Sequence, residues 1–273
     1  MSIRFVFRSL LTISALSLLI LLPAGRGVAE AASANRVLLA RHTSSEPVSI
    51  SSKRLETLSE AVVLVKGYDP LPMYTFTYER VNGILIATPK QVGIMRVTHS
   101  TGSGFFVTSS GYLVTNSHVA DGALSYAVVT DDATYDTLVI YRDREHDLAI
   151  LKVSPNKKQF EALQLADTKP SVGEPVFSIG NALGTYVDSV SIGNVLSLSE
   201  DVIATDRGEH TESTLLGVIK TSAKLYPGDS GGPLLNAKGK VVGVSVATTI
   251  GENVGFAVPL EALADALAVI NVK

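Results

Sequence analysis

The chain contains no cysteine and no tryptophan among its 273 residues. The lack of cysteine excludes disulfides, thiol catalysis and thiolate-bound metals, so packing alone must hold the fold together. The five histidines show no His-x-x-x-His spacing of the kind that binds zinc on a helix. We therefore expect neither a metal nor a cofactor.

A charge excess of either sign is also missing. The formal net charge is −3, only 18% of residues are charged, and no dense run of lysine and arginine occurs. Nucleic-acid binding depends on such basic surface, so we expect no nucleic-acid partner. An apolar content of 46% in a chain of this length is typical of one large globular domain or two small ones.

The N-terminal residues have the pattern of an export signal. Arg4 and Arg8 precede an apolar stretch over 10–22, and Ala29 and Ala31 are small residues at the two positions that a signal peptidase reads. The stretch is shorter than the roughly 20 residues of a membrane span. We predict a signal peptide over 1–31 and an exported protein, periplasmic or secreted. The alternative is an uncleaved segment that anchors the protein to the membrane.

A serine- and proline-containing stretch over 32–52 predicts a flexible segment, and 53–273 then forms the folded domain. Short β patterns follow one another, separated by turns that contain Gly, Asn or Asp, which favours a sandwich or barrel. The strands are expected at 61–65, 104–108, 112–115, 126–130, 137–141, 148–153, 175–179, 187–196, 216–221, 233–235, 241–247 and 254–258. Helices are expected at 53–60 and 260–267, so the fold class is all-β with a short C-terminal helix.

The region between 67 and 101 is the least regular. Its prolines and Gly83 predict breaks, and 84–87 and 94–97 are expected to pair as a hairpin around Pro89-Lys90. This insertion is long for a connection. Gating of an active site, oligomerisation and simple surface decoration are all open for it.

One segment carries a strong chemical signal, Gly228-Asp229-Ser230-Gly231-Gly232-Pro233. A serine hydroxyl is a poor nucleophile and needs a base, a residue that orients the base, and donors for the oxyanion. Gly228 lets the backbone bend so that the amides of Gly228 and Ser230 point into one space. We predict that Ser230 is a nucleophile and that these two amides form an oxyanion hole; a simple tight turn between strands is the alternative.

The predicted base is His118, which follows the strand over 112–115 and is followed by the small residues Val119 and Ala120. A histidine at a strand end is often only structural, but beside a candidate nucleophile a base is the better interpretation. The orienting acid is assigned to Asp147, because it opens the apolar strand 148–153. Asp121 and Asp143 are the competitors. The order His118, Asp147, Ser230 is that of chymotrypsin.

These segments also resemble the HtrA (Deg-type) serine proteases. The similar stretches are 101–105 (Thr-Gly-Ser-Gly-Phe), 111–119, 180–184, 227–236 and 253–259, within a match that runs from about 55 to 267. The resemblance implies two perpendicular six-stranded β-barrels with the triad His118, Asp147 and Ser230 in the cleft between them. It also implies oxyanion-hole amides from Gly228 and Ser230, and trimers are common in the family.

The chain departs from that family at three places. Asp229 stands where the family usually has Asn; in digestive relatives an aspartate there pairs with an N-terminus made by activation cleavage. No suitable apolar N-terminus follows Ala31, so we expect no such switch. Lys224 replaces an apolar residue near the expected specificity pocket. PDZ domains usually follow the protease domain, and none is expected here.

Lys224 leaves two interpretations of the pocket. If its ammonium points inward, it would favour an acidic residue on the acyl side of the cleaved bond (P1). If it points to solvent, as most lysines do, the pocket is apolar and lined by Val244, Ser245 and Val246.

Three functions follow from these patterns. The first is an exported serine endopeptidase that acts on protein or peptide substrates, unfolded or damaged proteins by resemblance. The second is a specialised peptidase with acidic preference, like a glutamyl endopeptidase. The third is a binding or chaperone-like module on a protease scaffold, which the presence of all three triad residues disfavours.

Overall fold

The computed structural model describes residues 50–154, 158–182, 186–205, 212–246 and 254–272. The described residues fall into two compact units, Pro72–Met95 and the rest. The elements in chain order are α1 (Ser52–Ser59), β1 (Val62–Val81), β2 (Ile84–Phe106), β3 (Tyr112–Thr115), β4 (Ser125–Val129), β5 (Thr134–Asp143), β6 (Leu148–Val153), β7 (Pro175–Ala182), β8 (Tyr186–Thr205), β9 (Glu212–Thr221), β10 (Pro233–Asn236), β11 (Val241–Val246), β12 (Gly255–Pro259) and α2 (Leu260–Val269).

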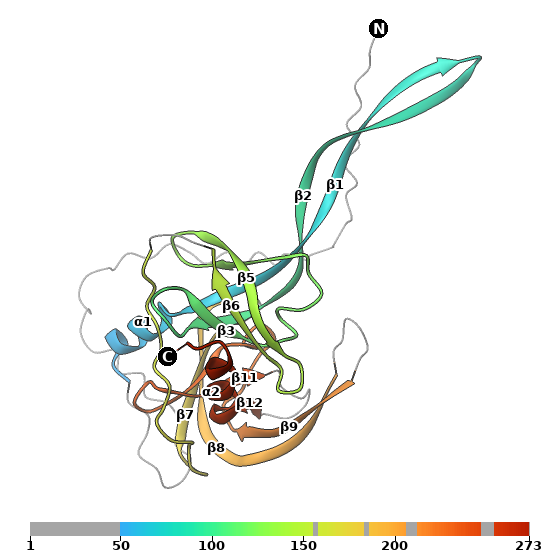
Figure 1. The fold of residues 1–273 in the computed structure, drawn as a ribbon. Coiled ribbons are helices and arrows are strands. Elements are labelled where there is room, and N and C mark those ends of the chain that lie inside the picture. Colours follow the sequence, from blue (N-terminus) through green and yellow to red (C-terminus); the bar gives the residue numbers. More distant parts are fainter. Residues whose placement is uncertain (1–49, 155–157, 183–185, 206–211, 247–253, 273) are drawn as a thin grey trace, which may run out of the picture. The chain divides into compact units, whose positions relative to one another are not determined.

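The strands of this described part close into two six-stranded barrels (Figure 1). The first has the strand order β1-β2-β3-β6-β5-β4 and the second β10-β11-β12-β9-β8-β7. The predicted fold class, two six-stranded barrels followed by a C-terminal helix, is confirmed. The N-terminal predictions over 1–31, and those over 32–49, fall outside the described residues.

Successive side chains of a strand point to opposite faces, so one strand can contribute to two hydrophobic clusters. In the first barrel, Phe106 and Leu113 belong to the cluster that fills its interior. Their neighbours Phe105 and Val114 belong to a second cluster, which also contains Phe177 from β7 and residues of α2. Because successive side chains point to opposite faces, each strand packs inside its own barrel and against the rest of the domain.

The predicted hairpin between 84–87 and 94–97 is wrong. Segments 84–87 and 94–97 do not pair with each other, because both lie on the single strand β2. The turn is instead Asn82-Gly83, with φ values of +51° and +83°, the conformation of the tightest hairpin turns. In a two-stranded ribbon each strand is an edge, so Pro72 and Pro89 do not interrupt it.

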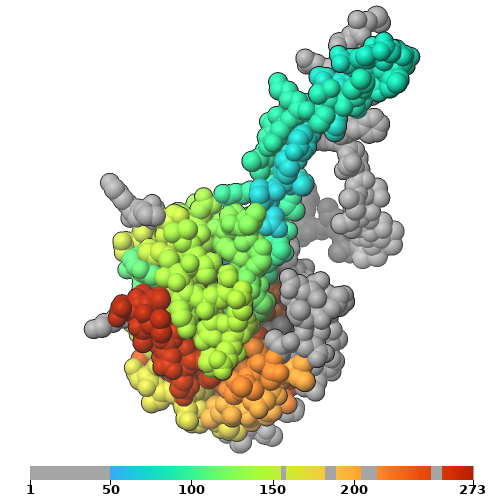
Figure 2. Space-filling view, turned by 45° about the vertical axis from the view of Figure 1, so that its right-hand side comes forward, coloured from blue at the N-terminus to red at the C-terminus, as the bar shows by residue number. Residues whose placement is uncertain are grey.

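Helix α2 packs its apolar side against the barrels. Leu260, Leu263, Ala266 and Leu267 are buried, and the helix contacts β6, β11 and β12. On the face shown in Figure 2 its atoms, in red, lie against those of residues near 140. No helix among the described residues combines the length and the hydropathy needed to cross a membrane.

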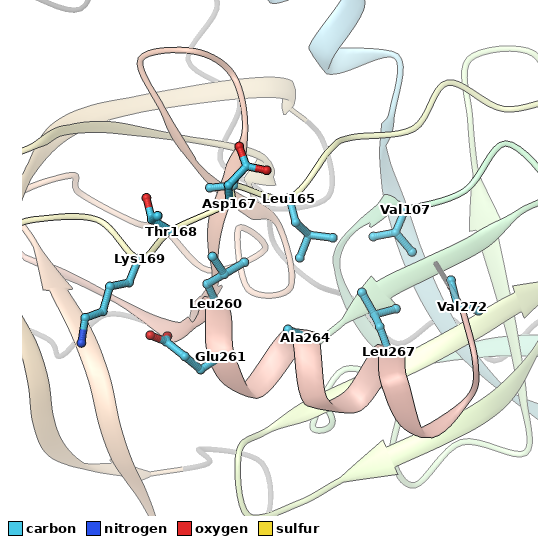
Figure 3. Close-up of a pocket in the computed structure, with 11 residues that line it drawn as sticks. Val107, Leu165, Asp167, Thr168, Lys169, Leu260, Glu261, Ala264, Leu267 and Val272 are labelled. Carbon is cyan, nitrogen blue, oxygen red and sulfur yellow. The ribbon is translucent and has the colours of Figure 1, made fainter.

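A pocket of about 430 Å³ lies along α2. Leu260, Ala264 and Leu267 of the helix form one side, and Leu165 and Asp167 belong to the other (Figure 3). None of the predicted catalytic residues lines this pocket.

Candidate active site

His118 lies in the turn after β3, where Asp147 holds it through two atoms. The His118 backbone N–H donates to Asp147 Oδ1 at 3.0 Å, and His118 Nδ1 lies 2.8 Å from Asp147 Oδ2. Because an ionised carboxylate only accepts, the proton of this pair lies on Nδ1. The lone pair of the imidazole is then on Nε2, which is the tautomer that a general base needs.

Asp147 is fixed in an unusual backbone conformation. Its φ is +52°, a region that residues other than glycine rarely adopt. Asn116 Nδ2 donates to the Asp147 carbonyl at 2.9 Å, and only 7% of Asp147 is exposed. Such backbone strain persists where surrounding contacts enforce it and is common at functional sites.

The two competing aspartates have other partners. Asp121 pairs with Arg142 and Arg144. Asp143 accepts from His146 at 2.8 Å. Burial raises the pKa of Asp143, but hydrogen bonds from the His146 ring and backbone outweigh it and hold that pKa below its ordinary value. Of the three candidates, it is Asp147 whose carboxylate contacts His118.

Ser230 lies in the loop between β9 and β10. The loop is tied to β11 by two backbone bonds of 2.8 Å, from the Gly231 N–H to the Ser245 carbonyl and from the Ser245 N–H to the Gly232 carbonyl. The Ser103 N–H donates to the Ser230 carbonyl at 2.8 Å. Both barrels therefore hold the loop, since Ser103 belongs to β2 and Ser245 to β11.

Two glycines show how closely Ser230 approaches the His118 turn. A Cβ on Gly102 would lie 2.5 Å from Val119 Cγ2 and 3.0 Å from the Ser230 carbonyl oxygen. A Cβ on Gly231 would lie 3.1 Å from the Asn116 N atom. The backbone of Ser230 and Gly231 thus lies close to the chain before and after His118, and Gly102 and Gly231 have no side chain to prevent this approach.

The two predicted oxyanion donors lie in this same loop. Gly228 has φ +100°, which only glycine adopts without strain. Ser103 Oγ donates to the Gly228 carbonyl at 2.6 Å, and fixes the orientation of that carbonyl. No hydrogen bond from the N–H of Gly228 or of Ser230 is made within the described part of the chain.

Of the pocket residues predicted from the sequence, three lie on β11 and are buried. Val244 and Val246 belong to the core cluster shared by the two barrels, and Ser245 Oγ lies 2.8 Å from Ser178 Oγ. Lys224 is exposed, with its Nζ 5.2 Å from the centroid of the Tyr226 ring. The structure thus brings His118, Asp147 and the Ser230 loop together and leaves Lys224 on the surface.

Comparison with known proteins agrees with this geometry. The family described as the trypsin-like peptidase domain matches residues 102–244, which include His118, Asp147 and Ser230. The chain belongs to the trypsin-like peptidases. Within the described residues, no group of three or more His, Cys, Asp or Glu side chains has the arrangement of a metal site.

The relatives of this trypsin-like peptidase confirm the resemblance to the HtrA and DegP-like group. It is 33% identical over 221 residues to a putative serine protease, HhoA, of Synechocystis sp., covering 78% of this chain and 53% of that protein. It is 40% identical over 164 residues to a probable periplasmic serine endoprotease, DegP-like, of Bartonella henselae, covering 58% of this chain and 31% of that protein. The chain therefore spans about half or less of the length of these relatives.

A solved structure shares the fold. The serine endoprotease from Yersinia pestis aligns with a TM-score of 0.54 and 24% identity, over 79% of this chain and 65% of that one. At this level of identity the alignment supports the double-barrel architecture.

Ser103 is a site residue that the sequence did not single out. Its Oγ donates to the Gly228 carbonyl, accepts from the Asn181 N–H at 2.8 Å, and its carbonyl accepts from Thr115 Oγ1 at 2.7 Å. The residue is fully buried. Its position between Gly102 and Gly104 was the one available signal, since flanking glycines indicate close backbone approach.

We expect Ser103→Ala to lower kcat by about 10-fold or more, because the orientation of the Gly228 peptide is lost, and to cost about 1–3 kcal/mol of stability. Kinetics on a fluorogenic peptide and thermal unfolding would measure the two effects. Ser178→Ala is the matched control, since it removes another buried hydroxyl, one bonded to Ser245 Oγ, and should cost stability without lowering kcat. Equal kcat values for the two variants would contradict the role given to Ser103.

Proposed function

We propose that this trypsin-like peptidase is a serine endopeptidase that hydrolyses peptide bonds in proteins, with Ser230 as nucleophile, His118 as base and Asp147 as the residue that orients the base. The observation that carries the proposal is the double contact of Asp147 with His118, beside the turn on which the Ser230 loop packs. Serine catalysis needs an oriented base near the nucleophile, and this arrangement supports the proposal.

The proposed reaction has two halves. Ser230 Oγ attacks the substrate carbonyl carbon while His118 Nε2 takes the hydroxyl proton, and the N–H groups of Gly228 and Ser230 stabilise the oxyanion. The protonated His118 then gives its proton to the leaving amine, which breaks the peptide bond and leaves an acyl group on Ser230. Water repeats the sequence and releases the acid. Asp147 stabilises the positive imidazole in both halves.

The substrates, location and assembly are also proposals. We propose unfolded or damaged proteins as substrates, by resemblance. We also propose that the protein is exported, either periplasmic or secreted, because of the sequence pattern over 1–31 and because the Bartonella relative is named as periplasmic. A trimer is proposed by resemblance alone. Light scattering on the purified protein would measure its mass.

The role of Lys224 decides which P1 residue the substrate pocket prefers. The Lys224 ammonium lies over the exposed Tyr226 ring. This placement favours the apolar alternative, and we propose an apolar pocket. In matched peptides with Glu, Val or Ala at P1, Val and Ala should be cleaved at least as well as Glu. Lys224→Gln should change the Val-to-Glu ratio of kcat/KM by less than about twofold. A loss of about 10-fold or more in cleavage after Glu would support the acidic alternative instead.

The function itself is tested by incubating the purified protein with unfolded casein and mapping the products by mass spectrometry. Internal cleavage that a serine-directed fluorophosphonate blocks would support an endopeptidase. Suppression of casein aggregation without any cleavage would favour the chaperone-like alternative and overturn the proposal.

A further inference from the structure

Beside the nucleophile lies a buried carboxyl that the proposed mechanism does not use. Asp229 is only 2% exposed. Its Oδ1 lies 2.7 Å from Ser189 Oγ on β8, and its Oδ2 accepts from the Tyr226 N–H at 2.8 Å. No described cation pairs with this carboxyl, which is unusual because a buried charge normally requires one.

The hydrogen bonds around Ser189 show where a proton is needed. Ser189 Oγ lies 3.0 Å from the Gly180 carbonyl oxygen as well as 2.7 Å from Asp229 Oδ1. A hydroxyl has one proton, so Ser189 can donate fully to only one of these two oxygens. If Asp229 is ionised, Ser189 donates to one of these oxygens, and at the other contact two oxygens lie close together with no proton between them.

A neutral Asp229 completes the network. Its Oδ1–H donates to Ser189 Oγ, the Ser189 hydroxyl donates to the Gly180 carbonyl, and Asp229 Oδ2 still accepts from the Tyr226 N–H. Every close contact is then a hydrogen bond, which is the arrangement that buried polar groups adopt. The Asp229 carboxyl packs directly against the backbone of Gly180, since a Cβ on Gly180 would lie 2.5 Å from Asp229 Oδ1. This close packing leaves the carboxyl little room to turn toward other partners.

We propose that Asp229 is a positioning residue whose neutral carboxyl, acting as donor to Ser189, holds the nucleophile loop in its active shape, and that its ionisation loosens the loop. This proposal rests on the proposed function and deepens it. The carboxyl closes the turn from Tyr226 to Asp229, in which the Asp229 N–H donates to the Tyr226 carbonyl at 2.9 Å. That turn sets the orientation of Gly228, one of the two oxyanion donors.

The surroundings favour the neutral form. Burial raises the pKa of Asp229, against smaller lowering by the hydrogen bonds from Ser189 and Tyr226. Strand β7 carries no titratable residue, and the titratable residues on the loop itself, Lys224 and Tyr226, have exposed side chains. On the described part of β8, the facing group is the Ser189 hydroxyl.

The sign of the pH effect follows from this. A carboxyl whose pKa is raised on folding stabilises the fold below its ordinary value of about 3.9, and that contribution is lost as the pH rises through the folded pKa. Asp229→Asn should mimic the neutral form at all pH values, because its Nδ2 donates to Ser189 while its Oδ1 accepts from Tyr226. The variant should therefore lack this loss.

The test compares wild type, Asp229→Asn and Asp229→Ala between pH 4 and pH 8. The difference in Tm between Asp229→Asn and wild type should be near zero at pH 4 and grow in favour of the variant at higher pH. The ratio of their kcat values should rise in the same direction. Asp229→Ala should lose kcat by about 10-fold or more at every pH, since it has neither hydrogen bond.

Asp143→Asn is the matched control. The pKa of Asp143 is lowered, so its contribution to stability is present above its ordinary pKa and is lost as the pH falls. The variant should have a lower Tm than wild type throughout pH 4 to pH 8 and approach it only below about pH 4, so it should lack the growing difference expected for Asp229→Asn.

Two outcomes would overturn the proposal: an Asp229→Asn variant less stable than wild type at pH 8, or one whose kcat falls as far as that of Asp229→Ala. Either would mean that the loop needs the negative charge. The Tm comparison requires no catalysis. If the wild-type protein also shows no hydrolysis, that result counts against the proposed function. The trend of Tm with pH would still decide whether Asp229 carries the proton.

Discussion

Ser230→Ala should lower kcat/KM for a cleaved peptide by about 10⁴-fold or more while the protein stays folded. The substitution removes the attacking Oγ and nothing else, and the hydrogen bond that holds the residue uses its backbone carbonyl. The residual rate would come from the oxyanion hole and from binding. Progress curves with a peptide taken from the mapped casein sites, together with thermal unfolding, measure both quantities.

Retained hydrolysis by a folded Ser230→Ala protein would mean that another group attacks the substrate. Loss of activity together with a large fall in Tm would instead mean that the hydroxyl supports the fold. Ser189→Ala controls for loss of a hydroxyl near the loop that is not the attacking one, and it should retain far more activity than Ser230→Ala.

Asp147→Asn should lower kcat by about 10³- to 10⁴-fold at neutral pH. The amide keeps an oxygen for the His118 backbone N–H, but its NH₂ group faces Nδ1 and selects the wrong imidazole tautomer. Because the carboxylate also stabilises the positive imidazole in the transition state, the effect should appear in kcat more than in KM.

Asp143→Asn provides the comparison that isolates this effect. The Asp143 to His146 pair has the same 2.8 Å contact as the Asp147 to His118 pair, and an asparagine can still accept from the backbone of Glu145 and His146. It should keep kcat within about twofold of wild type, because the Asp143 carboxylate pairs with His146 and not with His118. A large loss in both variants would indicate a general effect on the segment before β6.

Most of the fold could be predicted because many of its strands coincide with short apolar patterns that are separated by turns. Strands β3 and β6 begin and end where their apolar patterns do, at 112–115 and 148–153. The pattern failed at 84–97, where Pro89 suggested a turn. An isolated ribbon has no inner strand for proline to disrupt, so Asn82-Gly83 was the stronger turn signal.

The site could be proposed from the sequence where the chemistry is contained in a local motif. The residues around Ser230 and the strand before His118 suggested their roles alone, and the structure brought Asp147 to His118. Ser103 and Ser189 could not be found in this way. Ser103 acts through the Gly228 carbonyl, 125 positions away, and Ser189 acts through Asp229, 40 positions away. A local pattern does not name a partner at such a separation.

A covalent label tests most directly whether His118 and Asp147 activate Ser230. A fluorophosphonate reacts with a serine that a neighbouring base has activated, and mass spectrometry of the digested protein locates the adduct. We predict a single adduct on Ser230, absent from Ser230→Ala and formed far more slowly in His118→Ala and Asp147→Asn. An adduct on another serine, or equal labelling of Ser230 in the His118→Ala protein, would contradict the account.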